Sequence, residues 1–230
     1  MKKSMPWIRC AGFLVGLAVI LGICDFCFAP SGYVRFILHE VNRKDTQYDT
    51  IILGASHARS AINPEYLDEE LGTNTLNLAI PGETVKDAYY LLKDACESND
   101  VKTVIMDVDY QYWMDEQPQG YFTEPFICQN ITNLKVKTEY LLDNWDTIDL
   151  RNVLVRRLSW DCTWSSVKQN VSTKMTEAYR EYSIEAAGVD GKVEGADGPY
   201  IGKGFFYRDT FGGKPGGADC GSAVITPVST

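Results

Sequence analysis

The sequence predicts an α/β protein in which a parallel sheet, covered by helices, follows an N-terminal transmembrane helix. Three observations predict this class. Residues 10–24 form an apolar run without a strongly polar side chain. Strand-like and helix-like patterns alternate over residues 50–108. The 230 residues are 45% hydrophobic and 23% charged, which is typical of a folded globular chain.

The composition excludes several classes of function. There are 22 Lys and Arg against 31 Asp and Glu, so the net charge is −9. This acidic balance argues against nucleic acid as a partner, because binding phosphates needs clustered basic residues. The two histidines, His39 and His57, and seven cysteines without CxxC spacing leave little basis for a metal site. We therefore expect neither a metal nor a cofactor; the four cysteines outside the N-terminal helix either form two disulfides or stay unpaired.

Residues 1–29 are predicted to anchor the chain in a membrane. Three basic residues flank the apolar run on its N-terminal side, Asp25 interrupts it, and residues 26–29 extend it. Its length lies between the core of a signal peptide and the ~20 residues that span a bilayer. We favour an uncleaved anchor over a signal cleaved after Ala29, because Pro30 would follow the cut. The basic flank places the N-terminus in the cytoplasm and the remaining chain outside.

Residues 49–230 are predicted to form an α/β domain, joined to the anchor by a polar connector at 30–48. Apolar runs, caps and breakers indicate strands and helices in alternation, which favours parallel strands with right-handed crossovers. A capping-box pattern at Thr84 and Asp87 marks one helix start. The predicted elements are a strand at 50–53, a helix at 64–71, a strand at 74–80, a helix at 85–97 and a strand at 101–108.

An irregular, partly helical insertion is predicted at about residues 111–221. Its first part is aromatic and loop-like, residues 134–158 and 165–187 have helical patterns, and residues 188–221 are rich in Gly and Asp. Three strands are fewer than the five or so of a doubly wound sheet. Either the sheet is small and completed irregularly, or the sequence is truncated relative to a complete domain; we expect truncation.

Two segments that directly follow predicted strands carry the residues suited to chemistry. ILGASHARS (residues 52–60) places Ser56 beyond the carboxyl end of the first strand, where open α/β sheets bind ligands. NLAIPGET (residues 77–84) follows the second strand, and its Gly82 lets the backbone approach the same crevice. A serine hydroxyl with backbone N–H groups nearby suits acyl transfer through an oxyanion.

Together these segments resemble the SGNH/GDSL hydrolase superfamily. ILGASH is similar to its first block, usually Gly-Asp-Ser, and NLAIPGET to its second, usually Asn-x-Gly-x-x-Gly-(Asp/Glu)-Thr. INPEYLDEELG and VIMDVDYQYW are similar to membrane-anchored bacterial members that act on cell-surface polymers. The resemblance covers about residues 47–113 and implies a flavodoxin-like parallel sheet of SGNH type, incomplete in this chain.

The resemblance implies a role for several residues. Ser56 would be the nucleophile, and its N–H and that of Gly82 would bind the oxyanion. His57, Asn77 and Asp109 would contact substrate, Asp109 standing nearest to the place where the family supplies an oxyanion-hole Asn. The family's last block, Asp-x-x-His, supplies the general base and is absent from these residues. Because a serine hydroxyl needs an adjacent base, we expect these 230 residues alone to be nearly inactive.

The expected function is that of a serine esterase or O-acyltransferase acting on acylated cell-envelope or exported polysaccharide. The main alternative is a non-catalytic, membrane-tethered accessory or glycan-binding module that keeps the crevice without the base. A third interpretation is a flavodoxin-like module that holds an anion at residues 54–57. The segment lacks the Gly and Lys richness of the better phosphate loops.

Overall fold

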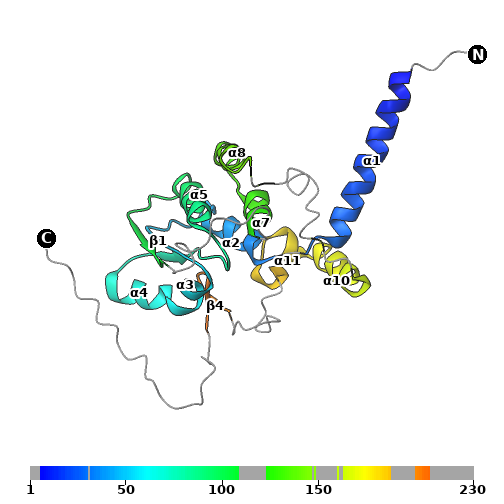
Figure 1. Ribbon diagram of the computed structural model, residues 1–230. Helices are drawn as coiled ribbons and strands as arrows, with labels where there is room; N and C mark the ends of the chain where they lie inside the picture. The colour runs from blue at the N-terminus through cyan, green and yellow to red at the C-terminus, as the bar shows by residue number, and fades with distance from the viewer. Residues whose placement is uncertain are drawn as a thin grey trace, which may run out of the picture.

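A long N-terminal helix projects from an α/β head in the computed structural model (Figure 1). The structure describes residues 6–30, 32–108, 123–146, 148, 160, 163–187 and 200–207. Helix α1 (Pro6–Phe28) is long and apolar enough to cross a membrane, a property that signal sequences share. Its apolar side chains lie on the outside, with Trp7 80% exposed, so α1 is not a core helix of the head.

The head contains the predicted parallel sheet. Strands β1 (Thr50–Leu53), β2 (Thr75–Asn77) and β3 (Thr103–Met106) lie in the order β2-β1-β3, and both pairs are parallel. All three predicted strands are therefore confirmed, although β2 and β3 are shorter than predicted. The pairing with β1 continues one residue beyond β2, where the N–H of Leu78 donates to the carbonyl of Ile52 at 2.8 Å.

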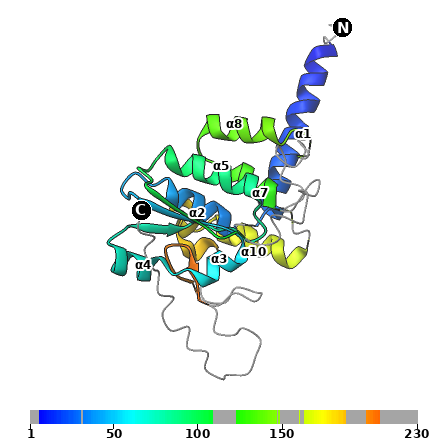
Figure 2. The same cartoon turned by 60° about the vertical axis from the view of Figure 1, so that its left-hand side comes forward.

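Helices cover both faces of this sheet. Ile51 and Leu53 of β1 point into a large apolar cluster with four helices, whereas Ile52 points into a smaller cluster with two. Figure 2 shows α5 and α8 on one side of the sheet and α3 and α4 on the other. The larger cluster is covered by α2 (Tyr33–Val41), α5 (Val85–Cys96), α7 (Thr123–Asn130) and α8 (Leu134–Asp143); the smaller by α3 (Ser56–Ala61) and α4 (Pro64–Leu71).

The helices at 64–71 and 85–96 begin as the sequence predicts. Asn63 accepts the N–H of Glu65 at the start of α4, and Gly72 ends that helix with φ of 67°. At the start of α5, Thr84 and Asp87 form the predicted reciprocal capping box. These local signals fix where each crossover begins and therefore how the strands are brought side by side.

Helix α2 occupies part of the segment 30–48, which the sequence indicated as a connector. Ile37, Leu38 and Val41 lie on one face of α2 and are fully buried in the larger cluster. Burying a side chain of this kind stabilises a fold by ~1.5–3 kcal/mol. The connector is therefore a helix that packs in the core, and it joins α1 to the head without a long flexible linker.

The predicted insertion contains short elements. Residues 165–187 form three pieces instead of one helix, and a hairpin lies within the stretch predicted to be irregular, while 149–159 of the predicted helix 134–158 lie outside the described residues. The elements are α10 (Trp164–Lys174), α11 (Glu177–Arg180), the 3-10 helix η2 (Ile184–Ala187), β4 (Tyr200–Gly202) and β5 (Phe205–Phe206).

Helix α10 holds the carboxyl end of α1. The buried ammonium of Lys174 donates to the carbonyl of Phe26 at 2.6 Å and to that of Ala29. Asn170 donates to the carbonyls of the two residues between them, at 3.2 and 3.3 Å. The last carbonyls of a helix have no N–H donor within it, so α10 supplies donors to acceptors that the end of α1 leaves open.

The two edges of the sheet differ. The β4–β5 hairpin lies against β2, where the N–H of Asn77 donates to the carbonyl of Lys203 at 2.8 Å. Among the described residues β3 pairs with β1 alone. On the face that carries the larger cluster, Val104, Met106 and Val108 are 42%, 38% and 53% exposed. The β3 edge is thus the open side of the described sheet.

Candidate functional site

The candidate site lies beyond the carboxyl ends of β1 and β3. The chain passes from β1 to β2 on one side and then to β3 on the other, so the connections diverge between β1 and β3. Open α/β sheets bind ligands at such a switch point. Gly54, directly after β1, has φ of 146°, and a Cβ there would stand 2.8 Å from the Cβ atoms of Ala58 and Asp107. Only glycine lets the chain turn this closely between α3 and β3.

Ser56 follows this turn as the first residue of α3 and is half-buried. The sequence predicted a turn here, whereas the structure forms a six-residue helix that begins at Ser56. Ala55 has extended backbone angles and precedes the helix. A short connection therefore places the serine at the edge where open α/β sheets bind ligands.

The loop after β2 makes a tight turn. Gly82 has φ of 77°, and the N–H of Glu83 donates to the carbonyl of Ile80 at 2.9 Å. Pro81 and Gly82 occupy the central positions, which is the pattern of a type II turn. The turn accounts for the glycine; the role of the Gly82 N–H in an oxyanion hole stays a prediction.

A buried carboxylate joins the two loops. Glu83 is 3% exposed and accepts the N–H of Gly54 at 2.8 Å and that of Ile80 at 2.9 Å. Burial raises the pKa of Glu83 well above its usual range, and the two backbone N–H bonds oppose that rise. Glu83 therefore fixes the loop that carries Ser56 against the loop that carries Gly82.

Asn77 forms hydrogen bonds that hold α3 in place beside the same loops. Its amide is fully buried and donates to the carbonyls of Ala58 at 2.9 Å and Ile62 at 3.0 Å. Its side-chain oxygen accepts the N–H of Ala79 at 3.2 Å. These bonds tie α3 to the end of β2, and a contact between Asn77 and substrate stays a prediction.

Of the other predicted site residues, the structure describes His57 but not Asp109. His57 is exposed, and successive helix residues project about 100° apart. A contact between His57 and substrate stays a prediction. His39 lies on α2, where its ring stacks on Tyr182 with centroids 3.8 Å apart. Asp109 lies outside the described residues.

Arg59 of α3 is buried among aromatic side chains. Its guanidinium stands 4.6 Å from the ring centroid of Phe206 and 5.7 Å from that of Tyr33, and the residue is 6% exposed. Such a placement over aromatic faces stabilises a cation. In this way α3 is packed against α2 and the β4–β5 hairpin.

Within the described ranges, no three Asp, Glu, His or Cys side chains gather in a metal-binding group.

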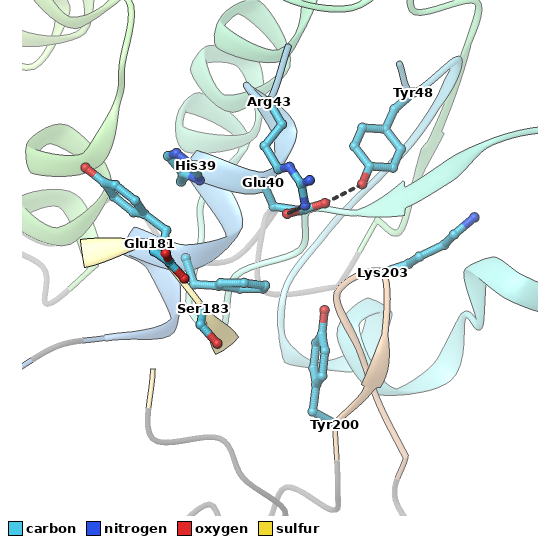
Figure 3. A pocket seen from close by; sticks show the side chains of 10 residues that line it. His39, Glu40, Arg43, Tyr48, Glu181, Ser183, Tyr200 and Lys203 are labelled. Carbon is cyan, nitrogen blue, oxygen red and sulfur yellow. Dashed lines mark hydrogen bonds and ion pairs between the residues drawn. The ribbon is translucent and has the colours of Figure 1, made fainter. Parts of the chain in front are cut away.

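A separate polar cavity of about 390 Å³ lies between α2, the segment after α11 and the hairpin (Figure 3). Glu40 accepts the Tyr48 hydroxyl at 2.8 Å and pairs with Arg43 at 3.2 Å. Tyr48 precedes β1, so this cavity lies toward the amino ends of the strands, away from Ser56. The lining residues are Phe36, His39, Glu40, Arg43, Tyr48, Glu181, Tyr182, Ser183, Tyr200 and Lys203.

Sequence reasoning missed Glu83 as a structural residue and missed this cavity. Glu83 was visible as part of NLAIPGET, but nothing local to that motif says that its carboxylate is buried. The cavity brings together residues from positions 36–48 and 181–203, which no sequence spacing connects.

No family model, no curated protein and no solved structure matches this chain. The resemblance to SGNH hydrolases therefore stays a prediction from the two sequence blocks.

Proposed function

We propose that this chain belongs to a membrane-anchored serine esterase or O-acyltransferase of SGNH type, with an acylated cell-envelope or exported polysaccharide as substrate. The observation that carries the proposal is the Glu83 bridge. It holds the two loops that follow β1 and β2 together at the carboxyl edge of the sheet, next to Ser56. A rigid pair of such loops is what a nucleophile and an oxyanion hole require.

In this reaction the Ser56 hydroxyl oxygen attacks the acyl carbonyl, and its proton passes to a general base. The ester C–O bond breaks, the sugar hydroxyl leaves with that proton, and an acyl-serine remains. Water then releases the acid in an esterase, or a second hydroxyl takes the acyl group in a transferase. By the family resemblance, this base would be the imidazole of an Asp-x-x-His block, which these 230 residues lack.

Labelling with a fluorophosphonate probe tests the nucleophile in the product of the gene's whole reading frame. We expect the wild type and Ser60→Ala to be labelled and Ser56→Ala to remain unlabelled. Ser60 is the matched control because it lies on the same short helix. Equal labelling of the Ser56→Ala variant and the wild type would overturn the assignment.

We also propose that α1 is an uncleaved anchor with its N-terminus in the cytoplasm and the head outside. Cleavage after Ala29 would remove the carbonyls that Lys174 and Asn170 bind, and with them the bonds that hold α10 to α1. Intact-mass measurement of the protein from membranes tests this. A mass that lacks residues 1–29 would refute it.

The second candidate is a membrane-tethered glycan-binding module, and the polar cavity favours it. Its volume suits a sugar unit, since ligand pockets measure ~300–1,000 Å³. Carboxylate, guanidinium and phenol groups beside aromatic rings are the chemistry that binds sugars. If the gene ends at the codon for Thr230, oligosaccharide binding measured by calorimetry should be weakened by Glu40→Gln and unchanged by Glu69→Gln on exposed α4.

A further inference from the structure

We propose that α10 lies at the membrane–water interface, with the Trp164 indole among the phospholipid headgroups. This inference rests on the proposed anchoring of α1 in a membrane. It adds a second contact with the bilayer, made by a part of the head that is more than a hundred residues away in the sequence.

The first argument is the depth of α10. Rising 1.5 Å per residue, α1 extends about 32 Å from Trp7 to Phe28, close to the ~30 Å of a hydrocarbon core. With Trp7 at one interface, the last turn of α1 reaches the other. Lys174 and Asn170 bind the carbonyls of that last turn, so α10 is held at interfacial depth.

The second argument is the fixed junction between the two elements. The indole N–H of Trp160 donates to the Asp25 carboxylate at 3.0 Å, and its ring lies 5.8 Å from the ring of Phe28. A carboxylate near the end of a membrane helix is thereby bonded instead of facing lipid. Figure 1 shows α10 beside the lower end of α1, on the side of the head from which α1 projects.

The third argument is the chemistry of the exposed face of α10. Trp164 is 87% exposed, and Lys168, one turn later on the same face, is also exposed. An exposed indole in water is unfavourable, whereas tryptophan is enriched at membrane interfaces. A lysine beside it suits the phosphate of a headgroup. Both side chains match one occupant, a phospholipid interface.

Fluorine NMR of the full chain, labelled with 5-fluorotryptophan and reconstituted in nanodiscs, tests the proposal. The lipid carries a nitroxide near its ester groups, and single Trp→Phe replacements assign the resonances while leaving the measured protein unsubstituted. We expect the nitroxide to abolish the Trp7 and Trp164 signals. Discs without the nitroxide are the matched control, and both signals should persist in them.

The outcomes separate the two proposals. Loss of the Trp7 signal with retention of the Trp164 signal would overturn the interfacial position of α10 and leave the anchor intact. Retention of both signals would refute the anchor itself.

Discussion

The Glu83 bridge makes a quantitative prediction for Glu83→Gln. The carboxylate accepts two buried N–H groups, from Gly54 and Ile80, one on each oxygen. A glutamine carbonyl can accept one of them, but its NH₂ group faces the other donor. A buried N–H left without an acceptor costs ~1–3 kcal/mol. We therefore expect the free energy of unfolding to fall by this amount, about 5- to 150-fold in the folding equilibrium constant.

Two measurements on the full chain in detergent micelles check this value. Urea unfolding gives the loss of free energy, and hydrogen exchange of the Gly54 and Ile80 amides locates it. Glu69→Gln, on the exposed side of α4, makes the same chemical change without a buried partner. If Glu83→Gln changes stability no more than Glu69→Gln does, within ~0.5 kcal/mol, the bridge does not hold the loops.

The remaining predictions concern pH, a buried hydroxyl and the tight turn. Because burial raises the pKa of Glu83 above its unfolded value, its proton-linked stability is complete below pH ~4.5 and is lost as pH rises through the raised pKa. The excess stability of wild type over Glu83→Gln should therefore shrink from pH 4 to pH 8 in urea titrations, and an increase would contradict the sign. Tyr140→Phe removes a 2.6 Å bond from the buried Tyr140 hydroxyl to Asp87 and should cost ~1.5–3 kcal/mol in the same assay, an unchanged midpoint being the contrary result. Gly54→Ala should cost ~2–6 kcal/mol through backbone strain and crowding, whereas Gly72→Ala, with φ of 67° and open space around it, meets the strain alone. Equal melting temperatures for these two variants would refute the crowding.

The parts of the fold that depend on local signals were predictable from the sequence. The strand at 50–53, the helix at 64–71 and the capped helix from residue 85 all carry their signals within one or two turns of chain. Helix α2 was also predictable in principle. Val34, Ile37, Leu38 and Val41 recur at helical spacing, but charged neighbours gave the segment the composition of a connector.

The parts that depend on distant contacts were not predictable. The β4–β5 hairpin has five residues in strands, and its position is set by Gly204, where a Cβ would stand 1.8 Å from the carbonyl oxygen of Asn77. For the site, the sequence placed Ser56 and Gly82 after their strands. The bond that joins their loops depends on the burial of Glu83, a property of the folded chain.

The open edge of β3 lies beside the crevice, so a strand added there would also place a loop at the candidate site. A strand that paired in parallel with β3 would bond the N–H and C=O groups that no strand of the described residues pairs with, and its connecting helix would cover Val104, Met106 and Val108. Such a strand would also end at the same edge as β1, so the loop that follows it would face Ser56. Completing the hydrogen bonding of the sheet and supplying further side chains to the crevice would thus be a single assembly step.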